Sequence, residues 1–361
     1  MVHRTGTATL PLHGGKAPRW LFERMTLLAG AIIAYMAEEL GRAETVYRFS
    51  DPYWFQSFGC VLGFDWHSSG VTTTTCGAVK EALKTRSDLA IFAAGGKGAA
   101  SRRTPEEIEV QAHGVGLEGT EDLVRASRMV AKVDNNALQD GYQIYHHFFL
   151  FTDKGEWAVI QQGMNEGNGY ARRYHWISRG LRDFVEEPHA AICAERRGPA
   201  MNLVDARSAE TREVMAKLSW ENPDKLTSQL QRLKNLELPR RHQLFLEHLS
   251  PASVGRVLLK TYERQPEDFA ALLEMPGVGA RTLRALALIS ELVHGTSLSW
   301  EDPAHFGFAH GGKDGYPYPV DRATYDRSIE IMERAIKRLR QGIREREEAL
   351  RRLARVTNWD Q

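Results

Sequence analysis

The sequence predicts an α+β protein in which an N-terminal mixed α/β domain, residues 1–200, precedes an all-helical domain, residues 201–361, with a long C-terminal amphipathic helix. Two observations lead to this prediction. Aromatic and β-branched runs separated by a turn lie before residue 200, whereas apolar residues recur with helical period after it. A chain of 361 residues is also long enough to form two domains, each with its own core.

The N-terminal domain is expected to begin with a strand at 6–12, a glycine-containing turn at 13–18 and an apolar helix at 19–40. The most apolar part of that helix, residues 27–37, is too short to span a bilayer and has charged neighbours. We therefore expect a buried helix, no membrane partner and a cytoplasmic protein.

The next segments alternate between helix and loop. An apolar strand within the aromatic run 51–63 is expected to lead into a loop that carries Asp65 and His67. A helix is expected at 78–84, and another begins at Thr104, which caps it.

The clearest strands are expected at 142–152 and 157–162, with a hairpin turn at 153–156. Because neighbouring side chains of a strand point to opposite faces, His146 and His147 are not expected to bind one metal together. A glycine-rich loop follows, and it carries Arg172, Arg173 and His175.

The C-terminal domain is expected to consist of helices. They are predicted at 210–219, 223–234, 238–249, 252–263, 266–275 and 280–294. A loop at 295–320 leads to a last helix, 324–355, whose apolar residues repeat in heptads. The repeat is formed by Tyr325, Ile329, Met332, Ile336, Leu339, Ile343, Leu350 and Leu353. This stripe either joins two copies of the chain in a homodimer or packs back on the helical domain.

Composition limits the classes of function. The net charge of +1 gives no global basic field, so a nucleic-acid site has to be a local patch. The three cysteines are widely spaced, which argues against a disulfide framework and against a cysteine-rich zinc site. Neither glycine–lysine turn, at 13–16 or 95–98, has the spacing of an ATP-binding P-loop.

Residues 272–283 contain the motif that indicates a partner most directly. A leucine-rich helix end, Pro-Gly-Val-Gly and a second helix start resemble the helix-hairpin-helix motif of DNA repair proteins, here spanning 268–294. Backbone N–H groups at such glycines and at the start of a helix bind phosphate without reading base sequence. The residues expected to contact DNA are Gly277, Val278, Gly279, Arg281 and Thr282. The alternative is a glycine turn between two core helices.

Three further stretches resemble a prokaryotic family known as domain of unknown function 763. They are residues 9–21, with Leu-His-Gly-Gly-Lys, residues 60–70, with Phe-Asp-Trp-His-Ser-Ser-Gly, and residues 162–176, with Gln-Gly-Met-Asn and Ala-Arg-Arg-Tyr-His-Trp. The resemblance implies a DNA-associated protein and supplies no mechanism. The strand before residue 165 and the arginines after residue 170 are also similar to ParB-like nuclease domains, although an insertion separates the glycine from the arginines.

Polar loops of the N-terminal domain are the expected place of catalysis. Asp65 and His67 could bind a divalent metal, Mg²⁺ or Mn²⁺, or act as general acid and base. His13 and His175 are further catalytic candidates. Lys97, Arg172 and Arg173 are expected to hold phosphate, because a guanidinium presents a planar fork of donors to it.

These expectations favour a nuclease that acts on damaged, branched or single-stranded DNA. The first alternative is a non-catalytic dimeric DNA-binding repair adaptor. The second is base excision by Asp321, which follows Pro-Val as in helix-hairpin-helix glycosylases but lies farther from the hairpin than is usual. Arg281 stands where the lyase-active members have lysine, and an arginine cannot form a Schiff base. Asp321 could also simply cap the last helix.

Overall fold

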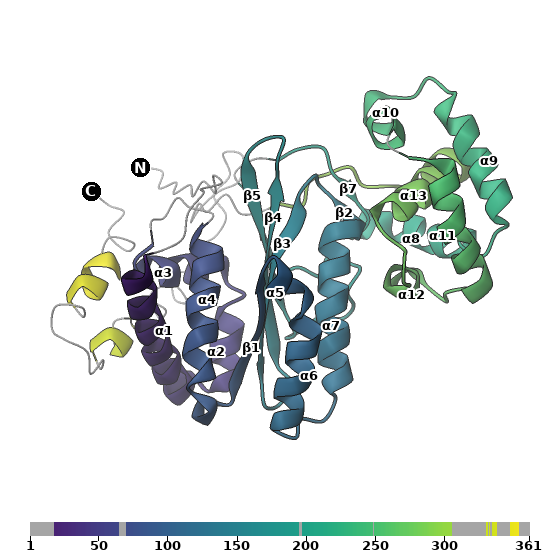
Figure 1. The fold of residues 1–361 in the computed structure, drawn as a ribbon. Helices are drawn as coiled ribbons and strands as arrows, with labels where there is room; N and C mark the ends of the chain where they lie inside the picture. The colour runs from purple at the N-terminus through teal and green to yellow at the C-terminus, as the bar shows by residue number, and fades with distance from the viewer. Residues whose placement is uncertain are drawn as a thin grey trace.

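A mixed sheet-and-helix body and an attached group of helices make up the structure (Figure 1). The computed structural model describes residues 18–64, 70–194, 197–247 and 249–304, together with 330, 332, 334–337 and 347–353. The α+β class is confirmed.

A five-stranded antiparallel sheet lies at the centre of the body, in the order β1-β3-β4-β5-β6. Its strands are β1 (Ile91–Lys97), β3 (Gln143–Thr152), β4 (Trp157–Asn165), β5 (Tyr170–Ile177) and β6 (Ala191–Cys193). The strands are nearly continuous runs of buried residues, because helices cover both faces of the sheet. The predicted hairpin at 142–162 is confirmed.

One face of the sheet is covered by the first four helices, shown in purple and blue in Figure 1. They are α1 (Arg19–Leu40), α2 (Arg42–Arg48), α3 (Pro52–Leu62) and α4 (Gly70–Lys84). Apolar residues three and four apart, such as Met25, Leu28 and Ile32, bury one side of α1 against this core. By length and composition α1 could also cross a membrane, a test that core helices of soluble proteins pass as well.

The second face is covered by α6 (Thr104–Gly114) and α7 (Thr120–Lys132), with the short α5 (Ala99–Arg102) beside β1. The turn η1 (Ser87–Leu89) contacts α4, and Leu89 belongs to the core on the first face. A π-helical turn, η2 (Val133–Ala137), extends α7.

The apolar core on this face continues into the C-terminal helices, so Phe149 of the sheet and Leu286 belong to one cluster. These helices are α8 (Ala209–Leu218), α9 (Pro223–Lys234), α10 (Arg240–Glu247), α11 (Pro251–Arg264), α12 (Phe269–Glu274) and α13 (Ala280–His294). They lie within a few residues of the predicted positions.

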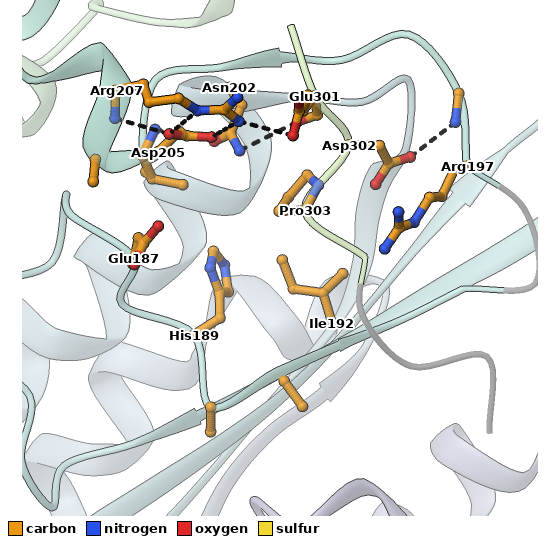
Figure 2. Close-up of a pocket in the computed structure, with 15 residues that line it drawn as sticks. Glu187, His189, Ile192, Arg197, Asn202, Asp205, Arg207, Glu301, Asp302 and Pro303 are labelled. Atoms are coloured by element: carbon orange, nitrogen blue, oxygen red, sulfur yellow. Dashed lines mark hydrogen bonds and ion pairs between the residues drawn. The ribbon is translucent and has the colours of Figure 1, made fainter. Parts of the chain in front are cut away.

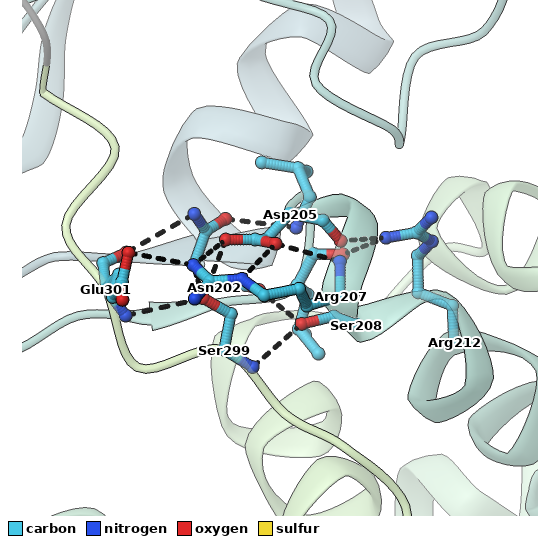
Figure 3. Close-up of polar contacts among 9 residues, drawn as sticks. Asn202, Asp205, Arg207, Ser208, Arg212, Ser299 and Glu301 are labelled. Carbon is cyan, nitrogen blue, oxygen red and sulfur yellow. Dashed lines mark hydrogen bonds and ion pairs between the residues drawn. The ribbon is translucent and has the colours of Figure 1, made fainter.

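The two parts are also joined by polar contacts around residue 200 (Figure 3). The short strands β2 (Leu138–Gln139) and β7 (Met201–Asn202) pair, and Asn202 forms a bridge with Ser299. After the turn η3 (Ala206–Ser208), Arg207 donates to Asp205 and to Glu301 at 2.6 and 2.9 Å. The return of the chain at 299–302 is therefore held against the start of the helical part.

The sequence prediction was wrong at two N-terminal segments. The aromatic run after Asp51 forms helix α3, because the Asp51 carboxylate accepts from the N–H groups of Tyr53 and Trp54 and Pro52 occupies the first turn. The expected loop with Arg172 and Arg173 is the strand β5, whose side chains are buried.

The predicted heptad helix is described only in pieces. Its seam residues Met332, Ile336 and Leu353 are at most 2% exposed and belong to the core formed by α1 to α4. These positions therefore pack within one chain. They pack against the N-terminal helices, and not against the helical domain as one of the two alternatives expected. The homodimer remains a prediction.

Candidate functional site

The hairpin between α12 and α13 has the backbone of a tight, open turn. Gly277 has φ +89°, a conformation that favours glycine, and it lies on the surface with Pro276 and Arg281. Gly279 precedes α13 in an extended conformation. Thr282, by contrast, is 3% exposed, so its side chain faces the core. Of the predicted DNA contacts, Gly277 and Arg281 are exposed and Gly279 is partly exposed, whereas the Val278 and Thr282 side chains are buried and the Val278 N–H already donates to the Met275 carbonyl.

The hairpin is fixed to the sheet domain by three polar side chains of α7, η2 and β2. Asn136 Oδ1 accepts from the Ala280 N–H at 3.1 Å, and Gln139 Nε2 donates to the Ala280 carbonyl at 2.9 Å. Lys132 Nζ donates to the carbonyls of Leu273 and Met275 at 2.6 and 2.9 Å. This cation sits at the negative end of α12, and burial lowers the pKa of Lys132. The hairpin therefore has one orientation relative to the sheet.

Two cavities lie near the hairpin. One, of about 730 Å³, lies along α6 and α7, and its cationic lining includes Arg102, Arg128 and Lys132. The other, of about 390 Å³, lies between the β2–β3 connection and α10 and α13, and Arg284 lines it. Asn135 borders both cavities, and the next residue, Asn136, binds the hairpin at Ala280.

The π-helical turn η2 directs a carboxylate into the core. Asp134 is fully buried, and it accepts hydrogen bonds from Gln161 Nε2, from Trp176 Nε1 at 2.9 Å and from His189 Nε2 at 2.5 Å. π-Helical turns occur frequently at functional sites. Here the turn supplies Asp134 to the core and Asn136 to the hairpin.

Polar contacts continue from Asp134 to the larger cavity beside the hairpin. Gln161 Oε1 lies 2.6 Å from His147 Nδ1, and His147 Nε2 lies 2.9 Å from Ser127 Oγ. Both Ser127 and His147 border the cavity of about 730 Å³. His147 is 4% exposed, and burial lowers its pKa.

His189 points into a third cavity, of about 710 Å³, on the other side of Asp134 (Figure 2). Acidic side chains predominate around this cavity, among them Glu187, Asp205 and Asp302. Asp205 is paired with Arg207, and that guanidinium lowers its pKa to about 2. The buried Asp134 fixes the orientation of the His189 ring at the wall of this cavity.

The two arginines predicted to hold phosphate are instead fully buried. Arg172 donates to Asp140 and to Asp302 at 2.7 and 2.6 Å. Arg173 donates to Gln56 at 2.9 Å and lies over the ring of Phe55 on the opposite face of β5. Their role in this structure is internal charge pairing and hydrogen bonding, which the burial of β5 between helices requires.

His175 is also buried, and burial, followed by the charge of Arg173, holds its pKa well below the usual value. Its ring touches Phe55 and Nδ1 lies 3.1 Å from the Phe49 carbonyl. Lys97 is exposed at the end of β1, with its ammonium 5.6 Å from the centre of the Tyr145 ring. Of the three side chains predicted to hold phosphate in the N-terminal domain, all of them described, Lys97 alone is exposed.

His13, Asp65, His67 and Asp321 lie outside the described residues. Within the described part of the chain, no group of three or more His, Cys, Asp and Glu side chains could hold a metal ion. The Mg²⁺ or Mn²⁺ prediction therefore still depends on Asp65 and His67.

Sequence reasoning missed Ser127, Gln161, Asp134 and His189, and it considered His147 only as a metal ligand together with His146. The one usable signal was the concentration of polar residues in otherwise apolar elements, as in the strand that contains His147. The pairing of Asp134 with His189, 55 residues later, has no local pattern that could reveal it.

The protein has an antiparallel sheet between two helical layers, and the hairpin of α12 and α13 is fixed to that sheet domain by hydrogen bonds. The chain belongs to the family described as protein of unknown function (DUF763), whose model matches residues 6–320. No curated protein and no solved structure is significantly similar to it. The helix-hairpin-helix and ParB-like resemblances are not among these matches and remain predictions.

Proposed function

We propose that the protein binds the phosphodiester backbone of DNA at the 276–281 hairpin and cleaves that DNA. The observation that carries the proposal is the exposed Gly277 turn at the start of α13, with Arg281 beside it. N–H groups at such a turn and the positive end of the helix dipole attract an anion. The neighbouring cavities contribute Arg102, Arg128 and Arg284.

DNA affinity measured over a series of salt concentrations tests the binding step. Arg281→Ala is expected to weaken binding about equally for unrelated sequences and to reduce the slope against salt by about one. Arg256→Ala is the matched control, because Arg256 is an exposed arginine of α11, another helix of the same region. Equal affinity and slope for the two variants would contradict the hairpin as the contact.

Cleavage is tested on branched and single-stranded DNA with Mg²⁺ or Mn²⁺. We expect the products that form only in the presence of the metal to disappear in the double variant Asp65→Ala, His67→Ala. Alkali treatment of the same samples detects abasic sites, the product expected if Asp321 excises bases.

A non-catalytic DNA-binding adaptor is the second candidate. It requires only the exposed hairpin with Arg281, which lies within the described residues. Binding without any product, with or without alkali, would establish this candidate over the nuclease.

A further inference from the structure

Ser127 and His147 form a polar pair at the wall of the cavity of about 730 Å³ beside α7. We propose that Ser127 is a nucleophile and His147 its general base, that Gln161 orients the base, and that the site cleaves a phosphate ester. That the phosphate ester belongs to DNA rests on the proposed function. The reactivity of Ser127 does not depend on that function.

Hydrogen bonds determine where the protons are. Gln161 Nε2 donates to the Val130 carbonyl at 3.3 Å and to the Asp134 carboxylate, so Gln161 Oε1 has to accept from His147 Nδ1. The Nε2 atom of a neutral His147 then carries a lone pair toward Ser127. The serine hydroxyl donates to it at 2.9 Å.

The imidazole is in the protonation state that a general base needs. Burial lowers the pKa of His147, so the ring is neutral at pH 7. Nucleophile, base and an orienting group within hydrogen-bond distance are the geometry shared by activated serines and cysteines.

The position of Ser127 is unusual for a helical serine. A serine inside a helix commonly donates to the carbonyl one turn earlier, as Ser290 of α13 does to Leu286 at 2.8 Å. The hydroxyl of Ser127 points away from its own helix and toward His147. Both residues border a cavity large enough for a ligand.

The surroundings favour a phosphoryl group over an acyl group. Acyl transfer needs free N–H donors for the oxyanion, and the N–H groups in the middle of α7 are used by the helix. Phosphoryl transfer is stabilised by cations, and the exposed arginines Arg102 and Arg128 border the same cavity. Its other charged side chains include Glu109, Glu121 and the ion pair of Arg125 with Glu274.

The reaction balances without a metal or a co-reactant other than water. Ser127 Oγ bonds to phosphorus as its proton passes to His147 Nε2. The bond from phosphorus to the leaving alcohol oxygen breaks, and that oxygen takes the proton. Water then attacks the phosphorus of the phosphoserine, and its proton passes through His147 to Ser127 Oγ as the bond from phosphorus to that oxygen breaks. The phosphate is released with one ester bond fewer than the substrate had.

A fluorophosphonate probe tests the nucleophile directly, since attack by Ser127 displaces fluoride and leaves a covalent label. We expect the full-length protein to gain one label, placed at Ser127 by peptide mass spectrometry. Ser127→Ala should lose the label, and His147→Asn should slow labelling by about 100-fold, the usual contribution of a general base. Ser101→Ala is the matched control, because Ser101 borders the same cavity and should leave labelling unchanged.

Gln161 is a positioning residue, and NMR tests it independently of labelling. The His147 Nδ1 proton, held by Gln161 at 2.6 Å, should give a downfield resonance that Ser127→Ala retains and Gln161→Ala loses.

Failure of this inference is distinct from failure of DNA binding. If the folded wild-type protein gains no label at Ser127, the proposed nucleophile is wrong, whatever the DNA affinity. If Ser127 is labelled but the protein does not bind DNA, the pair stands and the DNA function fails.

Discussion

The buried ion pairs of Arg172 with Asp140 and Asp302 give the sharpest test of whether Arg172 stabilises the fold or holds phosphate. Arg172→Met keeps most of the side-chain volume and removes the charge. The side chains of the three residues are at most 3% exposed, so the variant leaves two carboxylates in the core with no cation. Removing one partner of a buried ion pair costs about 3–5 kcal/mol of the free energy of unfolding.

The loss should also depend on pH. Burial raises the pKa of Asp140, and the charge of Arg172 opposes that rise. Without Arg172 the folded-state pKa rises further above the unfolded value, so the folded state holds a proton that the unfolded state releases. Stability of the variant is therefore retained at low pH and falls as pH increases. The deficit should be smaller at pH 5 than at pH 8.

Urea unfolding of the variant and of the wild type measures both effects. Arg182→Ala is the control, since Arg182 is exposed and a change there should alter stability by less than about 0.5 kcal/mol. If Arg172→Met is as stable as this control and loses DNA affinity, Arg172 holds phosphate and the internal role is refuted.

Three more predictions follow from buried groups. Gly95→Ala should destabilise the fold, because Gly95 has φ +89° and an added Cβ would collide with the His147 carbonyl. Gly98→Ala is the control, since Gly98 also has a positive φ but no atom lies within 4 Å of an added Cβ. The larger loss of unfolding free energy in urea for Gly95→Ala then measures the collision, without the backbone strain that both variants share. Burial raises the pKa of Cys193 to about 12, so this thiol should not react with a disulfide reagent at pH 8 until the protein is unfolded; rapid reaction in the native state would contradict its burial. Burial lowers the pKa of His146 to about 3, so its ring should stay neutral from pH 8 to pH 4, and an NMR titration in that range would disprove this.

The helices after residue 205 were the most predictable part of the fold. Amphipathic period and caps are local signals, and α9, with Asn222 accepting from the Asp224 N–H and Pro223 in the first turn, was predicted with the bounds that it has. The α3 helix was missed because its aromatic residues, such as Trp54 and Phe58, suit strands as well, and the cap at Asp51 decided the outcome.

The candidate site was much less predictable. The hairpin at 276–282 has a local glycine signature, and it was found. Arg172 and Arg173 were placed on a surface loop, because two adjacent charges after several glycines favour solvent. Their burial depends on partners distant in the sequence, Asp302 for one and Gln56 for the other. Long-range pairing of this kind leaves no periodic trace.

The bond between Arg172 and Asp302 also bears on how the chain is synthesised. The two residues are 130 positions apart, so the arginine of strand β5, which already has Asp140 as one partner, leaves the ribosome long before its second carboxylate. Until residues 299–304 emerge, the sheet has to keep Arg172 hydrated or only partly paired. Completion of the core around Arg172 therefore waits for residues 299–304, and a fragment that stops near residue 200 is expected to be a poor folding unit.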